Sequence, residues 1–402
     1  SFPICLNALM NLRMKFVGSW GRLGMKYKLS DICEYAKGKI KVSALDENTY
    51  ISTENMLPNK GGITKAASLP TQEQTQAFMK NDVLVSNIRP YFKKIWYATF
   101  DGGCSNDVLV FRAKDGVSSR FLHYVLADDT FFDYSMATSK GTKMPRGDKK
   151  AIMEYEVPEL LYEDQCKIAG VLEVIDEKID LNTDINKNLL EQAQSIFTQE
   201  FLMFDRIPDG WQESSLLGIA DYLNGLAMQK YRPKDDEQGL PVLKIKELRQ
   251  GSCDFNSELC SPSIKPEYIV HDGDVIFSWS GSLLVDLWCG GTCGLNQHLF
   301  KVTSSTYDKW FYYAWTDHHL QKFAAIAADM ATTMGHIKRE ELSKAEVLIP
   351  SQSDYDRIGG LLAPLYDLVI ANRIENRKLA SLRDELLPQL MSGQLDVSEV
   401  SL

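Results

Sequence analysis

Long hydrophobic runs are missing from this chain of 402 residues. No uninterrupted apolar run approaches the roughly 20 residues that a membrane-spanning helix needs. Residues 1–20 are mildly apolar, but Arg13 and Lys15 follow the apolar part, an order that does not fit a secretory signal. Hydrophobic residues make up 44% and charged residues 24%, as in soluble globular proteins. We therefore expect a cytoplasmic protein with no membrane partner.

Cysteine is scarce and shows no paired spacing. Eight cysteines in a chain of this length do not indicate a disulfide framework. Cys253, Cys260, Cys289 and Cys293 share one region, but the first spacing is too long for the tight pairs typical of a zinc site. Buried, reduced thiols are the simpler interpretation. We predict no metal site, with zinc as the alternative.

Recognised catalytic motifs are also missing. The sequence has neither a G-x-x-x-x-G-K-[ST] segment nor a G-x-G-x-x-G segment after a strand, the two common phosphate-binding loops. It has no H-E-x-x-H, no G-x-S-x-G and no Asn-Pro-Pro-aromatic segment of the kind found in amino-methyltransferases. His318 and His319 fall on a predicted helix, where a packed or solvated face is simpler than a metal site. We predict a non-catalytic chain, and an enzyme with unrecognised loop chemistry is an alternative.

Positive charge is in deficit, because the formal net charge is −10. Taken alone, this argues against nucleic-acid binding, which needs lysine and arginine to neutralise phosphates. A local basic surface can nevertheless coexist with an acidic remainder, and other subunits can supply positive charge. Net charge therefore does not decide the question.

Two long stretches carry the same heptad spacing, with apolar residues at alternating steps of four and three. The second repeats the first at a constant offset of 190 positions, as at 168 and 358. The seam positions are Ile168, Leu172, Ile175, Ile179, Asn182, Asn186 and Leu189 in the first stretch, and Ile358, Leu362, Leu365, Val369, Asn372, Asn376 and Leu379 in the second. At 1.5 Å per residue, the stretch 168–201 would form a helix roughly 50 Å long.

The seam asparagines favour one direction of pairing. An antiparallel pair would face Asn182 with Asn376, and Asn186 with Asn372. Facing amides satisfy each other's hydrogen bonds, and a slip in register would leave them unpaired in an apolar seam. A chain that leaves one helix for an intervening domain and returns also favours this direction. We therefore predict an antiparallel coiled coil, and the alternative is two core helices in unrelated places.

The segments before the long stretches also match each other. Leu29–Gly38 and Leu216–Gly225 each predict a short amphipathic helix that ends at a glycine. Asn81–Ser86 and Gly273–Ser278 each predict a polar turn followed by a buried strand. Further strands are predicted at 106–111, 296–301, 155–158 and 346–350, and helices at 120–132 and 307–328. The chain is therefore predicted to be a mixed α/β (α+β) protein with internal pseudo-two-fold symmetry.

This plan divides the chain into five parts. They are an extension with no assigned role (1–25), a first globular domain (26–158), a first long helix (159–205), a second globular domain (206–350), and a second long helix with a C-terminal tail (351–402). The two globular domains would be separated by the two long helices.

Polar loops at matched places in the two copies carry lysine, arginine, asparagine, glutamine and aromatic residues. These residue types contact phosphates and base edges in DNA complexes. Any one such loop is more simply a solvated loop, but their recurrence favours nucleic-acid binding. The predicted contacts are Lys37, Lys39, Lys41, Asn87, Arg89, Tyr91, Lys93, Lys140, Lys143 and Arg146 in the first domain, and Gln229, Lys230, Tyr231, Arg232, Ser278, Trp279, Ser280, Thr333, His336 and Lys338 in the second.

Over roughly residues 26–402, the chain resembles the DNA-specificity subunits of type I restriction-modification systems. The resemblance rests on the duplicated domain-and-helix plan and on four segments: Asp274–Ser278 with Gly281, Thr332–Lys338, Glu346–Pro350 and the tail Leu382–Gly393. The first copy is more divergent, because Thr142–Arg146 stands where the second copy has its Thr-Met-Gly-His pattern.

The resemblance implies two target-recognition domains, each of which recognises one half of a split, asymmetric double-stranded DNA site. The paired helices would set the gap between the halves and dock two modification subunits. Those partners would carry S-adenosylmethionine and methylate adenine, and restriction subunits would translocate and cleave DNA. This chain would hold no cofactor itself. A coiled-coil scaffold that gathers proteins without contacting DNA is the alternative, which the acidic net charge favours.

Overall fold

The computed structural model describes residues 26–141, 143–254, 256–329, 337–392, 394–395 and 397. The predicted extension 1–25 and the predicted contacts Thr333 and His336 lie outside these residues. The chain divides into two compact units: unit 1 comprises Ser1–Glu177 and Ala380–Leu402, and unit 2 comprises Lys178–Leu379. Each unit therefore holds one globular domain and a part of both long helices.

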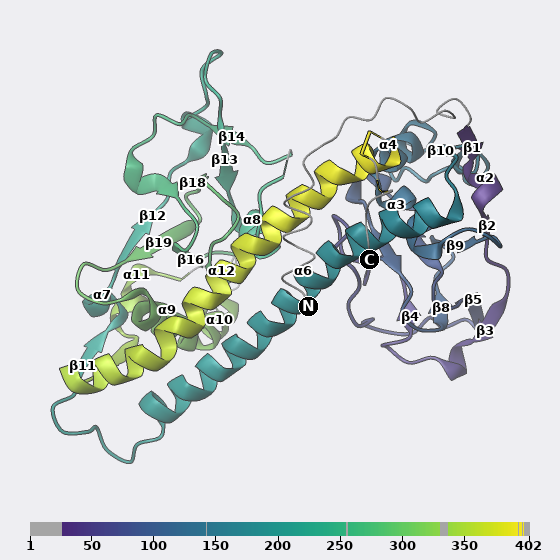
Figure 1. Ribbon diagram of the computed structural model, residues 1–402. Helices are drawn as coiled ribbons and strands as arrows, with labels where there is room; N and C mark the ends of the chain where they lie inside the picture. The colour runs from purple at the N-terminus through teal and green to yellow at the C-terminus, as the bar shows by residue number, and fades with distance from the viewer. Residues whose placement is uncertain are drawn as a thin grey trace. The chain divides into compact units, whose positions relative to one another are not determined.

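The described residues of unit 1 form three β-sheets as its framework (Figure 1). The first is antiparallel, with the order β2 (Cys33–Tyr35), β9 (Val108–Ala113), β6 (Val83–Ser86) and β7 (Ile95–Tyr97). The second has the order β3 (Lys39–Lys41), β5 (Gln74–Phe78), β8 (Gly102–Cys104) and β4 (Tyr50–Ile51), and β4 runs parallel to β8. β1 (Lys26–Lys28) pairs with β10 (Glu156–Pro158), so the two ends of the domain meet.

Helices cover the first sheet of unit 1. They are α2 (Leu29–Ile32), α3 (Ser119–Ala127), α4 (Asp129–Ala137) and α5 (Lys149–Ile152), with short 3₁₀ turns at Val42–Ala44 and Pro90–Phe92. Ser118 and Asp128 cap α3 and α4 by accepting hydrogen bonds from backbone N–H groups of the first turn. Phe111, Phe121 and Phe131 are buried between the sheet and these helices, and this burial of large apolar surface is the main stabilising contribution.

Unit 2 repeats this framework. Its first sheet is antiparallel, with the order β12 (Asp221–Asn224), β19 (Leu299–Thr303), β16 (Val275–Ser278) and β17 (Leu284–Leu287). Its second sheet has the order β14 (Leu259–Cys260), β13 (Leu240–Leu243), β18 (Cys293–Leu295) and β15 (Ile269–Val270). β11 (Gln212–Ser215) pairs with β20 (Glu346–Ile349), as β1 pairs with β10 in unit 1.

Among its described residues, five helices complete the globular part of unit 2. They are α7 (Leu216–Ile219), α8 (Ile245–Gln250), α9 (Lys309–His318), α10 (Leu320–Asp329) and α11 (Arg339–Ser343), with 3₁₀ turns at Met228–Lys230 and Pro266–Tyr268. Phe277, Phe300, Phe311 and Trp315 are buried in its core. Aromatic rings thus dominate this core as they do that of unit 1.

The long helices are α6 (Tyr162–Phe197), which continues as a π-helical turn at Thr198–Leu202, and α12 (Gln352–Met391). In unit 2 they lie side by side (Figure 1). Asn182 donates its amide N–H to Asn376 Oδ1 at 2.8 Å, and Asn372 donates to Asn186 Oδ1 at 2.9 Å. The predicted antiparallel pairing is confirmed. No helix in the described part of the chain is both long enough and apolar enough to cross a membrane.

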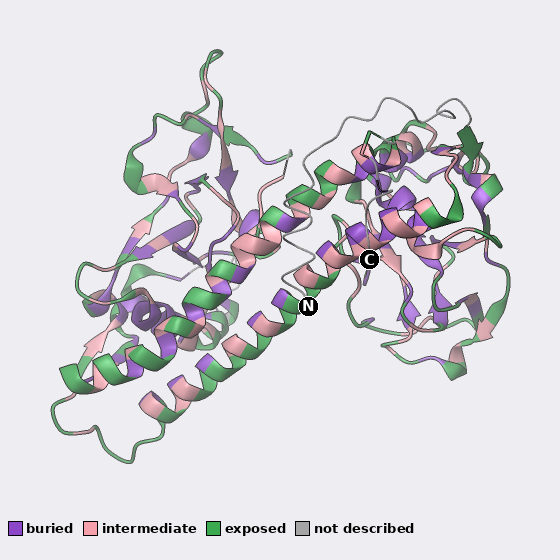
Figure 2. Ribbon diagram, in the orientation of Figure 1, coloured by how far each residue is buried: buried purple, intermediate pink, exposed green. Residues whose placement is uncertain are grey.

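Burial alternates along both long helices (Figure 2). The buried seam residues are Ile168, Leu172, Ile175, Asn182, Asn186, Ile358, Leu362, Val369, Asn372 and Leu379, and the half-buried ones are Ile179, Leu189, Leu365 and Asn376. Toward the end of α6, Ala193 and Phe197 pack into the unit 2 core. A straight helix has 3.6 residues per turn, whereas a heptad stripe repeats every 3.5 residues, so the stripe slowly rotates around the helix. The buried face of α6 therefore moves from the contact with α12 onto the neighbouring domain.

The helix predicted for Leu29–Gly38 is wrong after its first turn, and so is its counterpart at Leu216–Gly225. α2 ends at Ile32 and β2 begins at Cys33, and likewise α7 ends at Ile219 and β12 begins at Asp221. In each unit the segment pairs with a neighbouring strand, β9 or β19. Pairing in the sheet therefore overrides the local helical pattern.

Candidate nucleic-acid interface

Two predicted loops of unit 1, residues 86–94 and 140–148, meet through their backbones. Arg89 N–H donates to the carbonyl oxygen of Pro145 at 2.8 Å, and Gly147 N–H donates to that of Asn87 at 3.2 Å. Ile88 and Arg146 form an isolated β-bridge, as do Lys140 and Arg146. The structure therefore brings predicted contacts from two distant stretches of sequence into one paired loop.

The loop 86–94 combines strained backbone with exposed rings. Arg89 and Lys93 adopt left-handed φ angles of 51° and 49° on either side of the turn Pro90–Phe92. This region is unfavourable by about 1–2 kcal/mol for residues other than glycine. Tyr91 is 45% and Phe92 37% exposed, with ring centroids 4.7 Å apart. Strain of this kind concentrates at functional sites, which favours a binding role for the loop.

The cations of this surface differ in how far they are already neutralised. Three of the predicted contacts form ion pairs within unit 1: Lys93 with Asp129 at 2.7 Å, Lys140 with Asp148 at 2.6 Å, and Arg146 with Asp107 at 3.1 Å. The ammonium of Lys140 and two backbone N–H groups lower the pKa of Asp148 to about 2. Arg89 and Lys143 form no ion pair with any described residue, so these two cations are the most available to phosphates or bases.

Two buried polar atoms of the same loop have no hydrogen-bond partner among the described residues. They are Oδ1 of Asn87 and Nε of Arg89. Leaving such atoms unpaired typically costs about 1–3 kcal/mol each. A water molecule that supplied the missing partners would recover this free energy.

Lys37, Lys39 and Lys41 occupy a separate part of unit 1. All three are exposed, and Lys39 and Lys41 lie on β3, which pairs with β5 in the second sheet. No described hydrogen bond or ion pair joins these lysines to the loops 86–94 and 140–148. The predicted contacts of the first domain therefore form two groups.

In unit 2, Trp279 lies where three loops meet. Its indole N–H donates to Asn224 Oδ1 at 3.0 Å, and its ring centroid is 5.7 Å from that of Phe300 and 6.2 Å from that of His298. The hydroxyl of Ser280 lies 3.2 Å from Nδ1 of the same histidine. The loops 224–231, 278–282 and 296–298 therefore present one aromatic and polar surface.

The close approach of two of these loops requires a glycine. Leu226 N–H donates to Leu295 O at 2.9 Å, and Gln297 N–H donates to Leu226 O at 2.9 Å. A Cβ atom at Gly225 would collide with the carbonyl oxygens of Leu295 and Asn296. Gln297 and His298 were missed as candidates. The polar run 296–298 directly before a buried strand would have indicated them.

The other predicted contacts of unit 2 differ in accessibility. Ser278 is fully buried and donates its hydroxyl to Ser280 O and Ser282 O, so it shapes the loop from inside. Gln229, Lys230 and Lys338 are exposed. Tyr231 is 40% exposed, and Arg232 pairs with Glu258 at 3.1 Å.

Most of the cysteine thiols in the described part of the chain are buried. No three histidine, cysteine, aspartate or glutamate side chains there are arranged to hold a metal ion. Burial raises the pKa of the Cys33 and Cys104 thiols to about 12 and that of Cys289 to about 11. The pKa of the Cys253 thiol is instead lowered, chiefly by its hydrogen bond with Cys293.

A family model and two curated relatives match most of the chain. The model described as the type I restriction modification DNA specificity domain matches residues 24–191 and 208–382. The specificity subunit of type I restriction enzyme MjaIX of Methanocaldococcus jannaschii is 26% identical over 310 residues, which span 71% of each chain. The specificity subunit of HindI of Haemophilus influenzae is 20% identical over 465 residues, spanning 92% of this chain and 99% of the relative.

The fold matches a solved structure over nearly its whole length. The crystal structure of the type I restriction-modification system S subunit from M. genitalium aligns with a TM-score of 0.54 at 13% identity. The alignment covers 93% of this chain and 98% of that one. At this identity, the match establishes the shared fold.

Proposed function

The chain belongs to the type I restriction-modification DNA specificity family, and we propose that it recognises a bipartite, asymmetric DNA site, one half with each unit. The observation that carries this proposal is the paired loop at the end of β6 in unit 1 and its counterpart at the end of β16 in unit 2. The two loops occupy equivalent places but carry different side chains. Different donors and acceptors at equivalent places fit two half-sites of different sequence.

The predicted contacts of both units combine cations with neutral groups. Unit 1 offers Arg89 and Lys143, and unit 2 offers Lys230 and Lys338, all cations without ion-pair partners among the described residues. Unit 2 adds the neutral groups of Gln229 and Trp279. Arginine contacts guanine edges and phosphates, and glutamine contacts adenine edges. The long helices would hold the two units at a set separation and thereby fix the gap between the half-sites.

We further propose that the chain is non-catalytic and docks two modification subunits, which bind S-adenosylmethionine and methylate adenine, and with them restriction subunits. Leu361 and Leu368 support docking, because they lie one heptad apart on α12 and are 46% and 45% exposed. Leu181 on α6 is 46% exposed. Apolar side chains exposed at heptad spacing are suited to packing against a further helix.

The proposal predicts different effects for two loop variants of the assembled methyltransferase. Arg89→Ala should weaken binding to the cognate duplex by roughly tenfold or more, because a base-contacting arginine is worth about 1–3 kcal/mol of discrimination. Lys143→Ala should weaken cognate and scrambled duplexes alike and reduce the salt slope by about 1. Fluorescence anisotropy over a salt series measures both quantities, with the cognate site identified by sequencing methylated adenines.

Lys65→Ala is the matched control. Lys65 is a lysine of unit 1 with an exposed side chain paired to Glu47 at 2.8 Å, outside both loops. Its replacement should change neither affinity nor salt slope. Unchanged affinity and salt slope in both loop variants would contradict the proposed interface.

A further inference from the structure

A turn at residues 57–62 of unit 1 holds the recognition loop that follows β6. Asn59 N–H donates to Phe92 O at 2.8 Å, and Lys60 N–H donates to Lys93 O at 2.9 Å. No residue of this turn is among the predicted nucleic-acid contacts. The recognition loop is therefore held by a segment that the sequence did not single out, in addition to its pairing with the second loop of the interface.

Left-handed backbone is concentrated in these two segments. Among the described non-glycine residues, four of the five with a positive φ lie here. They are Asn59, Lys60, Arg89 and Lys93, with φ angles of 55°, 60°, 51° and 49°. Such a backbone is unfavourable for residues that carry a Cβ atom, and it persists only where surrounding contacts fix it. The contacts between the turn and the loop are placed to supply that constraint.

One carboxylate joins the side chains of the two segments. Asp129, the first residue of α4, binds the ammonium of Lys60 through Oδ1 at 3.0 Å and that of Lys93 through Oδ2 at 2.7 Å. Only 11% and 18% of these two lysine side chains are exposed. Partial burial would raise the pKa of Asp129, but the ammonium groups of Lys93 and Lys60 outweigh it and lower that pKa below its usual value of 3.8. We call Lys60, Lys93 and Asp129 the loop anchor.

The loop anchor is connected to the long helices. Lys60 Nζ lies 3.7 Å from a carboxylate oxygen of Asp384 on α12. The residue before it, Arg383, binds Asp384 at 3.1 Å and Asp176 on α6 at 2.8 Å. These parts of α6 and α12 belong to unit 1. A chain of ion pairs that begins at Lys93 therefore joins the recognition loop to the helices of its own unit.

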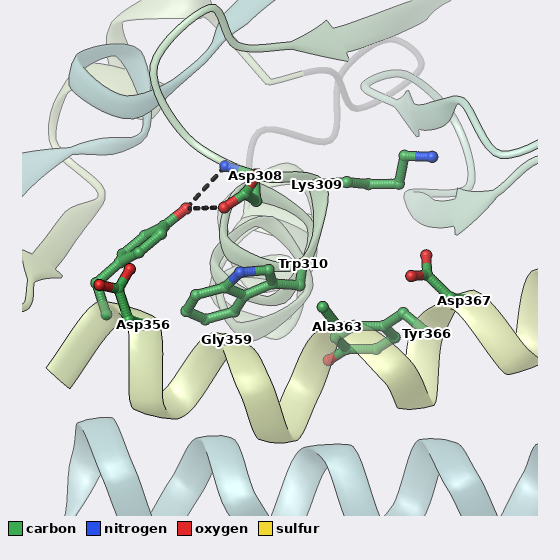
Figure 3. Close-up of a pocket in the computed structure, with 9 residues that line it drawn as sticks. Asp308, Lys309, Trp310, Asp356, Gly359, Ala363, Tyr366 and Asp367 are labelled. Atoms are coloured by element: carbon green, nitrogen blue, oxygen red, sulfur yellow. Dashed lines mark hydrogen bonds between the residues drawn. The ribbon is translucent and has the colours of Figure 1, made fainter. Parts of the chain in front are cut away.

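The corresponding loop of unit 2 is shorter. It spans residues 279–283 between β16 and β17, whereas the loop between β6 and β7 spans residues 87–94. A contact that fastens the unit 2 domain to α12 lies outside this loop: Asp308 N–H donates to the Tyr355 hydroxyl at 2.7 Å, and that hydroxyl donates to the Asp308 carboxylate at 3.2 Å (Figure 3). A longer loop loses more conformational entropy when it is fixed, so the loop of unit 1 has the greater need of a separate anchor.

We propose that Asp129 and Lys60 are positioning residues that hold the loop 86–94 in its DNA-binding conformation before DNA is bound. Phe92 N–H donates to Arg89 O at 2.9 Å, so the turn whose far end is anchored also carries Arg89. A loop that is already ordered loses little conformational entropy when it binds. The inference rests on the proposed function, because it assumes that this loop contacts DNA.

The proposal gives Lys93 a role different from the predicted contact. A lysine that contacts a phosphate releases counterions from DNA, so its removal reduces the salt dependence of binding. The ammonium of Lys93 is already neutralised by Asp129 and should release none. Loss of Lys93 should therefore weaken DNA binding without changing the salt slope, in contrast to loss of Lys143.

The first test needs no DNA and measures hydrogen–deuterium exchange of the full chain by mass spectrometry. Asp129→Asn removes the charge with little change in shape, and it should speed exchange in peptides covering 57–62 and 89–93 by about tenfold. Peptides of β6 and β9 should exchange as in the wild type. Asp133→Asn, an exposed aspartate one turn further along α4, is the matched control and should change neither set. Equal exchange in the two variants would overturn the anchor.

The second test measures binding of the assembled methyltransferase to the cognate duplex over a salt series. Asp129→Asn should weaken binding by about tenfold, although loss of a negative charge alone would favour DNA. Lys60→Met should have the same effect, and Lys60→Arg, which keeps the positive charge, should retain wild-type affinity. The salt slope should stay that of the wild type in these variants and in Lys93→Met. A slope reduced by about 1 in Lys93→Met would make this lysine a phosphate contact and contradict the anchor.

The outcomes separate this proposal from the proposed function. Loss of affinity in Arg89→Ala, with wild-type binding by Asp129→Asn and Lys60→Met, would show that the loop contacts DNA without the anchor, and the positioning roles would be wrong. Wild-type binding by Arg89→Ala as well would refute the loop as a DNA contact and the positioning roles with it. Exchange that rises throughout β6 and β9, or a Lys60→Arg variant as weak as Lys60→Met, would show a general structural role and overturn the positioning roles.

Discussion

Units 1 and 2 agree where the backbone is most constrained and differ where the chain reaches the surface. Asn81 and Gly273 both have positive φ angles, of 74° and 85°, directly before the turn into the buried strands β6 and β16. After those strands, Arg89 and Gly281 again share a positive φ, of 51° and 67°. The path of the chain is therefore kept through both loops, although one loop carries a long cation where the other carries only a hydrogen atom. The strands and turns fix the backbone path of each loop, whereas the side chains on the loops can differ.

The second sheets of the two units also share a core arrangement and differ at one edge. β4, β8 and β5 correspond to β13, β18 and β15, with one parallel and one antiparallel neighbour around the central strand. The fourth strand joins opposite edges, because β3 pairs with β5, whereas β14 pairs with β13. β3 carries Lys39 and Lys41, and Arg232 donates to Leu259 O in β14 at 3.4 Å. The strand that differs between the units thus lies at predicted nucleic-acid contacts.

Each domain is fastened to the helices of its own unit by different side chains. In unit 1, Lys60 pairs with Asp129 at 3.0 Å and approaches Asp384 of α12 at 3.7 Å. In unit 2, two arginines of α12 reach into the domain: Arg373 bonds Asp286 and Leu287 O, and Arg377 bonds Asp272 and Cys289 O. In both units ion pairs hold the domain against the helices, but the residues that form them differ.

The largest predicted difference between the units is in how much stability each loses at acidic pH. Burial lowers the pKa of His123 in unit 1 from its usual value of 6.5 to about 4, whereas the equivalent residue in unit 2 is Tyr313, whose pKa burial raises. Below pH 6.5 the unfolded chain therefore binds a proton at His123 that the folded unit takes up only near pH 4. Stability should fall as the pH drops through this window, by up to about 3 kcal/mol.

His123→Phe should remove most of that loss, as measured by urea unfolding at about pH 7.5 and about pH 4.5. Tyr313→Phe at the equivalent position is the control, and it should change the free energy of unfolding equally at both pH values. The expectation is wrong if the histidine variant loses as much stability in acid as the wild type does.

An intermediate effect is expected from the two asparagine pairs of the coiled coil. Asn186 and Asn372 share one hydrogen bond, so Asn186→Leu should cost about 1–3 kcal/mol by leaving the other amide unpaired. Replacing both by leucine should recover most of this loss. Asn182 also donates to Glu375, and Asn376 also donates to Ile179 O. The corresponding double replacement there should recover less, because further groups lose their partners.

Double-mutant cycles by urea unfolding compare the two pairs directly. The coupling energy should be larger for Asn186 with Asn372 than for Asn182 with Asn376. Equal recovery in the two double variants would show that the additional hydrogen bonds contribute nothing.

The sequence predicted the features that depend on local periodicity. The heptads and the repeated asparagines were sufficient for the antiparallel pairing, because each side chain's place in the seam follows from its spacing alone. The opposite placement of β3 and β14 could not be predicted, since it depends on non-local pairing that differs between the copies. The same holds for Lys93, whose ion pair with Asp129 forms only once a loop packs on a helix. His298 was not predicted as a contact because residues 296–301 were predicted to form a strand.

The smallest predicted effect on stability comes from exchanging the two positive-φ residues of the recognition loops. Arg89→Gly removes strain of about 1–2 kcal/mol but adds freedom to the unfolded chain worth about 0.4–1 kcal/mol. Its stability should therefore stay within about 1 kcal/mol of the wild type. Gly281→Arg imposes the strain in unit 2 and should be destabilising by about 1–2 kcal/mol.

Measuring DNA affinity together with stability tests whether the backbone strain at Arg89 serves DNA binding. If the strain at position 89 is kept so that the arginine side chain can contact DNA, Arg89→Gly should lose cognate affinity while its urea midpoint hardly moves. Lys65→Gly, outside both loops, is the control, because Lys65 lacks a positive φ and the replacement there relieves no strain and removes no predicted contact. A glycine at position 89 that kept wild-type affinity would mean that the two units differ at this position without consequence for recognition. A loss of more than about 2 kcal/mol of stability would instead make Arg89 part of the framework that both units share.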